Sequence, residues 1–227
     1  MIKSMNMKAG QFEFLRCPKS KTRLTFKQAY GEGILQGNLI SDHGKNYPII
    51  NGIPDLSYPS MLDPRTKEVM NWYDNNFQDY DEFLPVTFST FRVNEVKERQ
   101  KMINELAIHK DAKVLETGAG TGRDSLLIAE KLGENGELHV TDLNRNILEK
   151  ALPKLEKSKC KTFFNICNAI FLPYPDNYFD CYFHFGGFNT FSDKKAAFKE
   201  IARVVKKGGR VVVGDESMPP WLRKFDF

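Results

Sequence analysis

The chain has 227 residues, of which 41% are hydrophobic and 27% are charged, and its formal net charge is +4. This composition is that of an ordinary globular protein and excludes a disordered or fibrous chain. At roughly 100–200 residues per domain, the length allows one large domain or one domain with a small appendage.

The chain begins with Met1–Lys8, which lacks the apolar core of a signal peptide. No stretch approaches the roughly 18 consecutive apolar residues that a membrane-spanning helix needs. We therefore expect a cytoplasmic protein that makes no contact with a membrane.

The four cysteines are Cys17, Cys160, Cys167 and Cys181, so no two of them are separated by only two residues. This spacing excludes a zinc ribbon built from Cys-x-x-Cys pairs and a thioredoxin-like redox pair. We expect reduced thiols that pack as small hydrophobic groups.

Positive charge is concentrated near the start of the chain. Residues 1–60 contain 8 Lys and Arg against 4 Asp and Glu, whereas residues 61–227 contain 25 of each kind. A surplus of four is too small to predict nucleic-acid binding by itself, because such surfaces usually show a clustered basic face.

Residues 1–60 are predicted to form a small, β-rich module. Phe12–Leu15 and Arg23–Phe26 alternate as short strands do, and Tyr47–Pro54 is typical of an extended segment with a turn at Asn51-Gly52. Prolines between residues 54 and 64 mark the end of this module, since proline is unsuited to helix interiors.

Residues 61–110 are predicted to be a helical lead-in. Val69, Trp72, Tyr73 and Phe77 share one helical face ahead of Pro85, and a second helical run covers Val93–His109.

Residues 111–227 alternate between strands and helices. Strands are predicted at 113–116, 137–141, 162–166, 179–185 and 210–214, with helices at 125–132, 146–155 and 194–205. Strands separated by helices imply right-handed crossovers, so we expect an α/β fold with a mostly parallel, doubly wound sheet.

The most informative stretch is a glycine-rich turn after the first of these strands. Gly118, Gly120 and Gly122 let the backbone approach a ligand closely, and the helix that begins near Asp124 points its free N–H groups at the turn. Asp142 ends the next strand, where a carboxylate can accept hydrogen bonds from the ribose hydroxyls of an adenosine.

The spacing of this turn differs from that of a nicotinamide or flavin site. The dinucleotide fingerprint needs a third glycine at the position of Arg123. Glu116 precedes the first glycine by two residues, and a carboxylate there would repel a pyrophosphate but would attract an ammonium or sulfonium group. The pattern favours a positively charged nucleoside, S-adenosylmethionine.

Over residues 66–216, the chain resembles the class I S-adenosylmethionine-dependent methyltransferases, most closely the ubiquinone/menaquinone C-methyltransferase group. The resemblance implies a Rossmann-like core. Five blocks in the family's order carry it: Asn71–Asp74, Glu116–Gly122, Asp142, the pair Asn168–Tyr174 and Tyr178–Asp180, and Ala202–Gly209.

The resemblance also implies a set of residues that bind the cofactor. The turn would wrap the methionine, Glu116 would bind its amino group directly or through water, Asp142 would hold the ribose, and Leu143 would stack on adenine. Asn168 stands where the family usually has Asp. The full set is Tyr73, Glu116, Thr117, Gly118, Ala119, Gly120, Gly122, Asp142, Leu143, Asn168, Ala169, Phe185 and Gly186.

Methyl transfer is an in-line displacement at a sulfonium carbon, so no metal is expected and a base is needed only when the acceptor must lose a proton. His184, Asp215 and Glu216 lie at or near strand ends and are the candidate catalytic groups. Strand alternation leaves open whether each points into the site, and Tyr73 fits either a core position or one beside the cofactor.

Residues 12–56 resemble the small zinc-ribbon proteins that activate tRNA and protein methyltransferases, through Leu15–Pro18 and Tyr47–Pro54. Ser20 stands where those relatives often have a second Cys, and only His43 is near Cys17, so the ligands of a tetrahedral zinc are missing and we expect a metal-free module.

The family's sheet normally has seven strands, and the last two are missing here. We therefore expect an exposed fifth strand that favours a homo-oligomer.

We expect an S-adenosylmethionine-dependent methyltransferase that acts on a small molecule and releases S-adenosylhomocysteine. Two alternatives remain at this point. The basic first quarter of the chain fits an RNA methyltransferase, and the missing strands fit a regulatory protein that binds the cofactor without catalysis.

Overall fold

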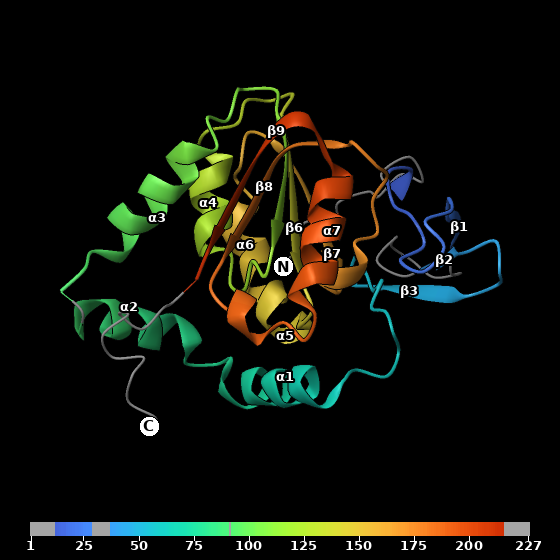
Figure 1. Cartoon of the computed structure of the whole chain (residues 1–227), viewed down its shortest axis with the longest axis horizontal. Helices are drawn as coiled ribbons and strands as arrows, with labels where there is room; N and C mark the ends of the chain where they lie inside the picture. Colours follow the sequence, from blue (N-terminus) through green and yellow to red (C-terminus); the bar gives the residue numbers. More distant parts are fainter. Residues whose placement is uncertain (1–11, 29–36, 91, 216–227) are drawn as a thin grey trace.

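A computed structural model describes residues 12–28, 37–90 and 92–215. A five-stranded parallel sheet with helices on both faces forms its larger part, and a small antiparallel sheet lies at one side (Figure 1). The parallel strands follow the order β7-β6-β5-β8-β9, with bounds β5 Lys113–Thr117, β6 Glu137–Asp142, β7 Lys161–Ile166, β8 Phe179–Phe185 and β9 Val205–Gly214. The predicted α/β fold and its five strands are confirmed.

The helical elements connect these strands and precede the first of them. In chain order they are α1 Pro64–Asn76, α2 Tyr80–Thr90, α3 Glu95–Glu105, α4 Arg123–Ala129, α5 Arg145–Leu148, η2 Glu149–Ala151, α6 Leu152–Leu155, η3 Ala169–Phe171, η4 Phe188–Thr190 and α7 Lys194–Val204. None of these helices is long and apolar enough to cross a membrane.

Successive residues of each strand pack into two different layers of the core, as the pleat of a strand requires. Val114 of β5 and Phe183 of β8 contact the layer that includes apolar side chains of α3 and α4. Leu115 and Tyr182 contact the layer formed by α7 and the small antiparallel sheet. The two sheets therefore share one hydrophobic layer.

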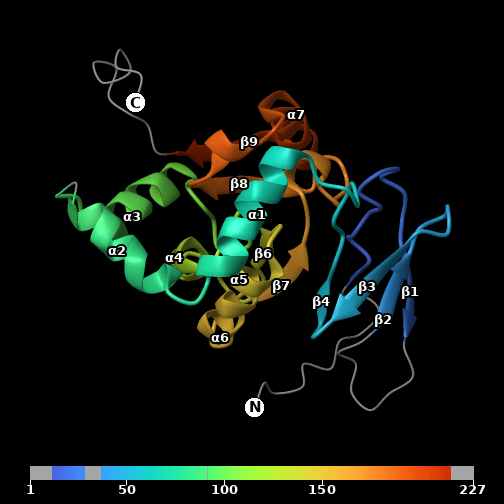
Figure 2. The ribbon, with the colours of Figure 1, turned by 90° about the horizontal axis from the view of Figure 1, so that it is seen from below.

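The strand order reverses direction between β5 and β8, at the centre of the sheet. In doubly wound sheets, ligands bind in the crevice outside the carboxyl ends of the strands at such a point. In the view from below, α1 crosses in front of this end of the sheet (Figure 2). The topology thus positions one site, between β5, β8 and α1.

The amino-terminal module is a four-stranded antiparallel sheet in chain order, made of β1 Thr25–Gln28, β2 Gly37–Ile40, β3 Asn46–Ile50 and β4 Ile53–Pro54. The predicted turn between β3 and β4 is present, with positive φ at Asn51 and Gly52. The expectation of a strand at Phe12–Leu15 is wrong, because these residues form a turn in which the Leu15 N–H donates to the Phe12 carbonyl at 2.9 Å.

This module also covers one edge of the parallel sheet. Asp55 pairs with Ile166 as an isolated parallel bridge, and the N–H of Leu56 donates to the Ile166 carbonyl at 2.8 Å. Ile166 ends β7, the outermost strand on that side. The module therefore satisfies backbone groups that an open edge would leave unpaired.

Hydroxyl and carboxylate groups hold the loop that follows Cys17. The Thr22 hydroxyl donates to Asp42 Oδ1 at 2.8 Å and lies 2.8 Å from the Ser20 hydroxyl, while Cys17 Sγ lies 3.3 Å from the Tyr47 hydroxyl. In the described part of the chain, no group of three or more His, Cys, Asp or Glu side chains is placed to hold a metal ion. The absence of zinc stays a prediction.

Helix α2 contains Pro85 and lies in the stretch that the sequence left unassigned between the two predicted helical runs. Proline removes the hydrogen bond that residue 85 would donate to the carbonyl of Asp81. That carbonyl instead accepts from Arg123 Nη1 at 3.3 Å. A cation from α4 thus replaces the missing N–H, and the helix continues through the proline.

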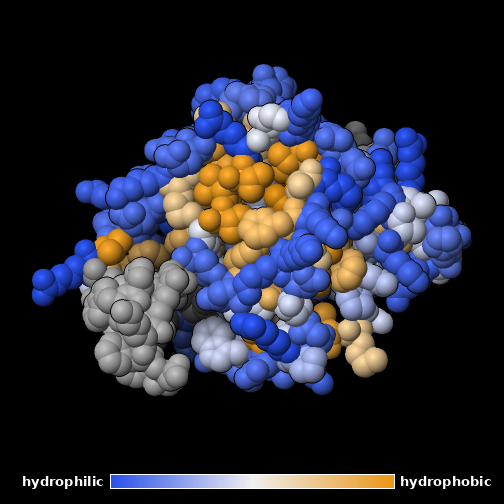
Figure 3. All heavy atoms as spheres, viewed as in Figure 1, coloured by the Kyte–Doolittle hydropathy of each residue, from blue (hydrophilic) through white to orange (hydrophobic). Residues whose placement is uncertain are grey.

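The other edge of the sheet, β9, has no strand beside it among the described residues. Figure 3 shows an apolar area over β9 and α7. Val211 of β9 is 43% exposed and Phe198 of α7 is 51% exposed. The expected exposed fifth strand is therefore seen.

Candidate functional site

A cleft of about 720 Å³ lies at the carboxyl ends of the strands, between the sheet and α1. Most of the residues predicted to bind or react line it: Tyr73, Thr117, Gly118, Gly120, Asp142, Leu143, Asn168, Ala169, His184, Phe185, Gly186 and Asp215. Glu116, Ala119 and Gly122 are not part of its lining. Glu216 lies outside the described residues.

The wall opposite the sheet is α1, which begins at the cap residue Asp63. The carboxylate of Asp74 accepts hydrogen bonds from Asn144 Nδ2 at 2.8 Å and from Asn146 Nδ2 at 3.0 Å. Asn144 follows the strand that ends in Asp142, so these bonds tie α1 to the loop after β6. Tyr73, next to Asp74, is thereby held over the cleft.

The glycine-rich turn needs glycine for conformation and for space. Gly118, Gly120 and Gly122 all have positive φ, of 63°, 55° and 80°. A Cβ at Gly118 would lie 2.7 Å from His184 Cε1, and one at Gly122 would lie 2.7 Å from the Cβ of Ala151. Gly118 and Gly120 thus present bare backbone to the cleft, whereas Gly122 allows α4 to pack against η2.

Asp142 is fixed at the end of β6 by two backbone donors. Its Oδ2 accepts from the N–H of Gly120 at 2.9 Å, and its Oδ1 accepts from the N–H of Asn144 at 2.8 Å. Burial raises the pKa of the Asp142 carboxyl. The two bonds fix the orientation of the carboxylate. Each oxygen keeps a second lone pair that can accept a further hydrogen bond.

Glu116 lies behind the turn. Its carboxylate accepts from the Ser125 hydroxyl at 2.5 Å, at the start of α4, and the residue is 2% exposed. Burial, with the nearby carboxylate of Asp124, raises its pKa well above the ordinary value. Its predicted contact with the cofactor would need a side-chain position different from this one.

Residues after β7 form the side wall of the cleft. Asn168 caps η3 by accepting from the N–H of Ile170 at 3.2 Å, and Cys167, Asn168, Ala169 and Ile170 all line the cleft. The Asn168 amide oxygen has a second lone pair that can accept a further hydrogen bond. This wall is where the sequence predicts contacts with adenine.

Arg99 lines the cleft and was missed by the sequence analysis. Its Nε donates to Glu95 Oε1 at 2.8 Å, its Nη1 donates to Asp124, and its guanidinium carbon lies 4.8 Å from the centre of the Phe185 ring. Burial raises the pKa of Asp124 to about 6. The Glu95 and Arg99 spacing of four residues predicts only a helical ion pair, with no indication of a site.

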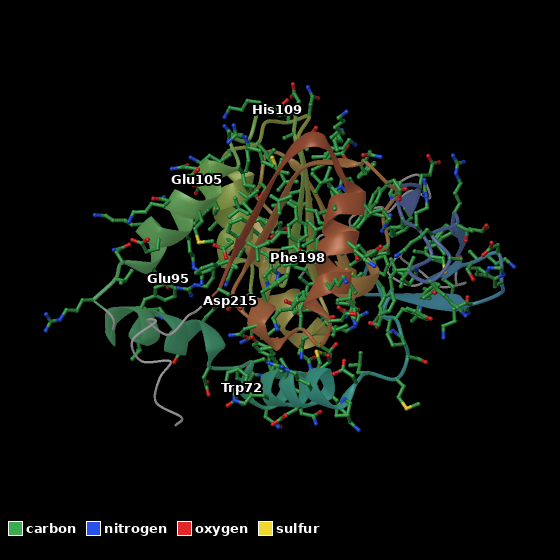
Figure 4. All side chains as sticks on the ribbon, viewed as in Figure 1. Trp72, Glu95, Glu105, His109, Phe198 and Asp215 are labelled. Carbon is green, nitrogen blue, oxygen red and sulfur yellow. The ribbon has the colours of Figure 1, made fainter. Side chains whose placement is uncertain are left out.

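The candidate catalytic groups differ in access. His184 is 1% exposed and its ring packs edge to face against the adjacent rings of Phe188 and Phe191, with centroids 5.4 and 5.1 Å away. Its Nδ1 lies 3.0 Å from the Thr117 hydroxyl, and burial lowers its pKa to about 4. Asp215, at the carboxyl end of β9 on the side where Trp72 and α1 lie, accepts from the N–H of Asn189 (Figure 4).

Comparison with known families identifies the chain. Residues 108–224, which include the turn, Asp142 and the side wall, match the family described as "Methyltransferase domain". The chain belongs to this family. Its match begins just before β5 and leaves out the amino-terminal module and α1 to α3.

Relatives of this methyltransferase domain agree with the match. The chain is 31% identical over 164 residues to the ubiquinone/menaquinone biosynthesis C-methyltransferase UbiE of Francisella tularensis subsp. tularensis, covering 70% of this chain and 64% of that protein. It is 33% identical over 161 residues to the demethylmenaquinone methyltransferase of Bacillus licheniformis, covering 70% and 67%. The chain thus spans less than two thirds of the length of the Francisella relative.

Solved structures share the fold of the methyltransferase domain. The YcgJ protein of Bacillus subtilis superposes with a TM-score of 0.50 at 28% identity, over 55% of this chain and 53% of that chain. Phosphoethanolamine N-methyltransferase 2 of Haemonchus contortus, solved with S-adenosyl-L-methionine, superposes with a TM-score of 0.55 at 19% identity, over 75% and 40%. The second similarity is one of fold alone.

Proposed function

We propose that the protein transfers a methyl group from S-adenosylmethionine to a small-molecule acceptor and releases S-adenosylhomocysteine. The charge of the cleft is the observation that carries this proposal. Among the described residues, the charged ones that line it are Asp79, Arg99, Asp142 and Asp215, and the cation in this set, Arg99, is already bonded to Glu95 and Asp124. A sulfonium cofactor suits such a cleft, whereas a pyrophosphate would meet net negative charge.

The fit of the nucleoside rests on the turn and on Asp142. Asp142 would accept hydrogen bonds from the ribose hydroxyls, since its Oδ2 already points at the turn. Gly118 and Gly120 would let the methionine part lie on bare backbone. Leu143, Asn168 and Ala169 would enclose the adenine, because they line adjacent walls of the same cleft.

The cofactor supplies an activated methyl group on a positively charged sulfur. The chain's own contribution is to align the two reactants and to exclude water, which is worth about 7–11 kcal/mol when the geometry is near ideal. Phe185, the last residue of β8, and Gly186 line the cleft, where they would flank the methyl group. Tyr73 on α1 would close the cleft from the opposite side.

Apolar side chains contribute to the part of the cleft that we assign to the acceptor. Val69 and Met70 of α1 and Phe191, which follows η4, are among the lining residues. A space of about 720 Å³ holds a cofactor and a small acceptor. This size, and the absence of a cation free to hold phosphates among the described lining residues, supports a small molecule over RNA.

Two side chains are proposed for an acceptor that must lose a proton. Asp215 lines the cleft and holds the η4 loop through the Asn189 N–H. His184 is neutral at pH 7, because burial lowers its pKa to about 4, but the residue is only 1% exposed and its ring packs against Phe188 and Phe191. Asp215 is therefore the better placed base.

Two measurements on the purified protein test this function. Calorimetric titration should show binding of S-adenosylmethionine and S-adenosylhomocysteine and none of NAD⁺. Labelled methyl groups should then move to members of a metabolite panel and not to RNA. Tight binding without any transfer would contradict catalysis and favour the regulatory alternative, and label on RNA alone would contradict a small acceptor.

A further inference from the structure

The amino-terminal module makes several of its polar contacts with the core at one segment, residues 166–173. Further polar contacts join Arg145 to the Ile50 carbonyl and to Asp55. The Leu56 N–H donates to the Ile166 carbonyl at 2.8 Å, and the Arg16 N–H donates to the Pro173 carbonyl at 2.9 Å. Between these two points, the Tyr58 ring lies 4.8 Å from the Phe171 ring, edge to face. The segment is thus held at both ends and in the middle.

Lys21 adds a charged contact from the module to the same segment. Its Nζ donates to the Leu172 carbonyl at 3.2 Å and to Glu200 Oε2 at 2.7 Å. Arg203 of α7 donates to the same carbonyl at 2.9 Å and also pairs with Glu200. Two cations from different parts of the chain therefore converge on one carbonyl, with Glu200 between them.

The segment that the module holds is also the side wall of the cleft. Cys167, Asn168, Ala169 and Ile170 line the cleft, whereas none of the described residues before Thr66 does so. The module therefore has no direct contact with a ligand in the cleft. The module can affect the cleft by fixing the position of this wall, and Tyr58 and Lys21 are two of the residues that contact it.

We propose that the amino-terminal module sets the affinity for the cofactor's nucleoside by fixing this wall, and that Lys21 is a positioning residue in that device. This proposal rests on the proposed function, because it assigns the wall to adenine. A wall held in its binding conformation loses less conformational freedom when the ligand binds. Loosening the wall should therefore weaken binding of any ligand that carries adenine.

The test compares Lys21→Met with Lys27→Met in the full chain. Lys27 lies exposed on β1, so Lys27→Met controls for the loss of one charge from the same module. Titration with S-adenosylhomocysteine and with 5′-methylthioadenosine should show binding about three to ten times weaker for Lys21→Met and unchanged binding for Lys27→Met. Because the second ligand lacks the amino-acid part, equal losses place the effect at the nucleoside.

Hydrogen exchange separates positioning from a general loss of stability. In Lys21→Met the amides of residues 168–172 should exchange faster, while those of β5 keep their protection. Lys21→Arg, which keeps a cationic donor near the Leu172 carbonyl, should restore most of the affinity. If Lys21→Met does not fold, Tyr58→Leu removes the ring contact with Phe171 and is predicted to weaken both ligands alike.

The outcomes distinguish the two proposals. Should the unaltered protein bind neither ligand, the proposed function fails. Should it bind both ligands while Lys21→Met and Tyr58→Leu bind them as tightly as Lys27→Met does, the proposed function stands and the role of the module is overturned.

Discussion

The ring of His184 occupies the space that a side chain at position 118 would need. A Cβ on Gly118 would lie 2.7 Å from His184 Cε1 and 3.2 Å from His184 Nδ1. The end of β8 therefore dictates glycine at the start of the turn. Packing against β8 therefore requires glycine at position 118 even before the needs of a ligand are considered.

Gly118→Ala should destabilise the protein by about 2–4 kcal/mol, since a positive φ costs about 1–2 kcal/mol outside glycine and overpacking costs about 1–3 kcal/mol. Gly186→Ala is the matched control, because Gly186 also has positive φ but no atom lies within 4 Å of its added Cβ. Urea unfolding measures both. His184→Ala should relieve much of the Gly118→Ala cost, and full additivity of the two changes would contradict the contact.

The burial of His184 predicts a dependence of stability on pH. Its pKa is lowered from 6.5 to about 4, so the neutral ring is favoured in the folded protein. The folded state has its full stability with respect to this group above pH 6.5. It loses stability as the pH falls from about 6.5 to about 4, because the unfolded chain binds the proton more tightly. At pH 5 the loss is about 2 kcal/mol.

Comparison of His184→Gln with the unaltered protein isolates this contribution, because Asp124 titrates in an overlapping range with the opposite sign. His184→Gln should lose less stability between pH 7 and pH 5 than the unaltered protein. His43→Gln, at an exposed position of the module, should behave as the unaltered protein does. The same pH profile in all three proteins would show that His184 is not held neutral.

The stability of the loop that follows Cys17 should depend on hydrogen bonds of hydroxyl groups and not on a bound zinc ion. Thr22→Val removes the bonds with Asp42 and Ser20 and should cost about 1 kcal/mol, whereas Thr25→Val, exposed on β1, should cost little. A chelator should leave the unfolding midpoint of the unaltered protein unchanged. One equivalent of bound zinc in native mass spectrometry would contradict this prediction.

The exposed β9 edge should promote self-association at high protein concentration, because its backbone groups and its apolar face are open in the described structure. Val211→Lys should shift sedimentation towards a monomer. Ile50→Lys, at a comparably exposed apolar residue of the module, should leave association unchanged. An unaltered protein that stays monomeric at high concentration would contradict the role of this edge.

The core was predictable because its signals are local. Val114 and Leu115 lie in a short apolar run that a glycine-rich turn ends, and Asp142 closes the next such run, so the strand ends and their acid follow from pattern alone. The strand order then brings Gly120 and Asp142 within hydrogen-bond distance. These features need no information from distant parts of the chain.

Other features depend on contacts between segments far apart in the sequence. Helix α2 continues through Pro85 because Arg123 of α4 bonds the carbonyl that proline leaves free. The guanidinium of Arg99 is placed at the cleft because it donates a hydrogen bond to Asp124 and packs over the ring of Phe185. The strand pleat sends Glu116 behind the turn, towards Ser125, although its place in the motif suggested the cleft. No local sequence pattern predicts where these residues lie.

Titration of Asp142→Ala with S-adenosylhomocysteine, beside Asp111→Ala, tests the central claim most directly. Asp111 lies exposed just before β5, at the opposite end of the strand from the turn. Loss of the charged acceptor for the ribose should weaken binding to Asp142→Ala about ten- to a hundredfold, and Asp111→Ala should bind as the unaltered protein does. Equal affinity in all three proteins would contradict a nucleoside held by Asp142 at the mouth of this sheet.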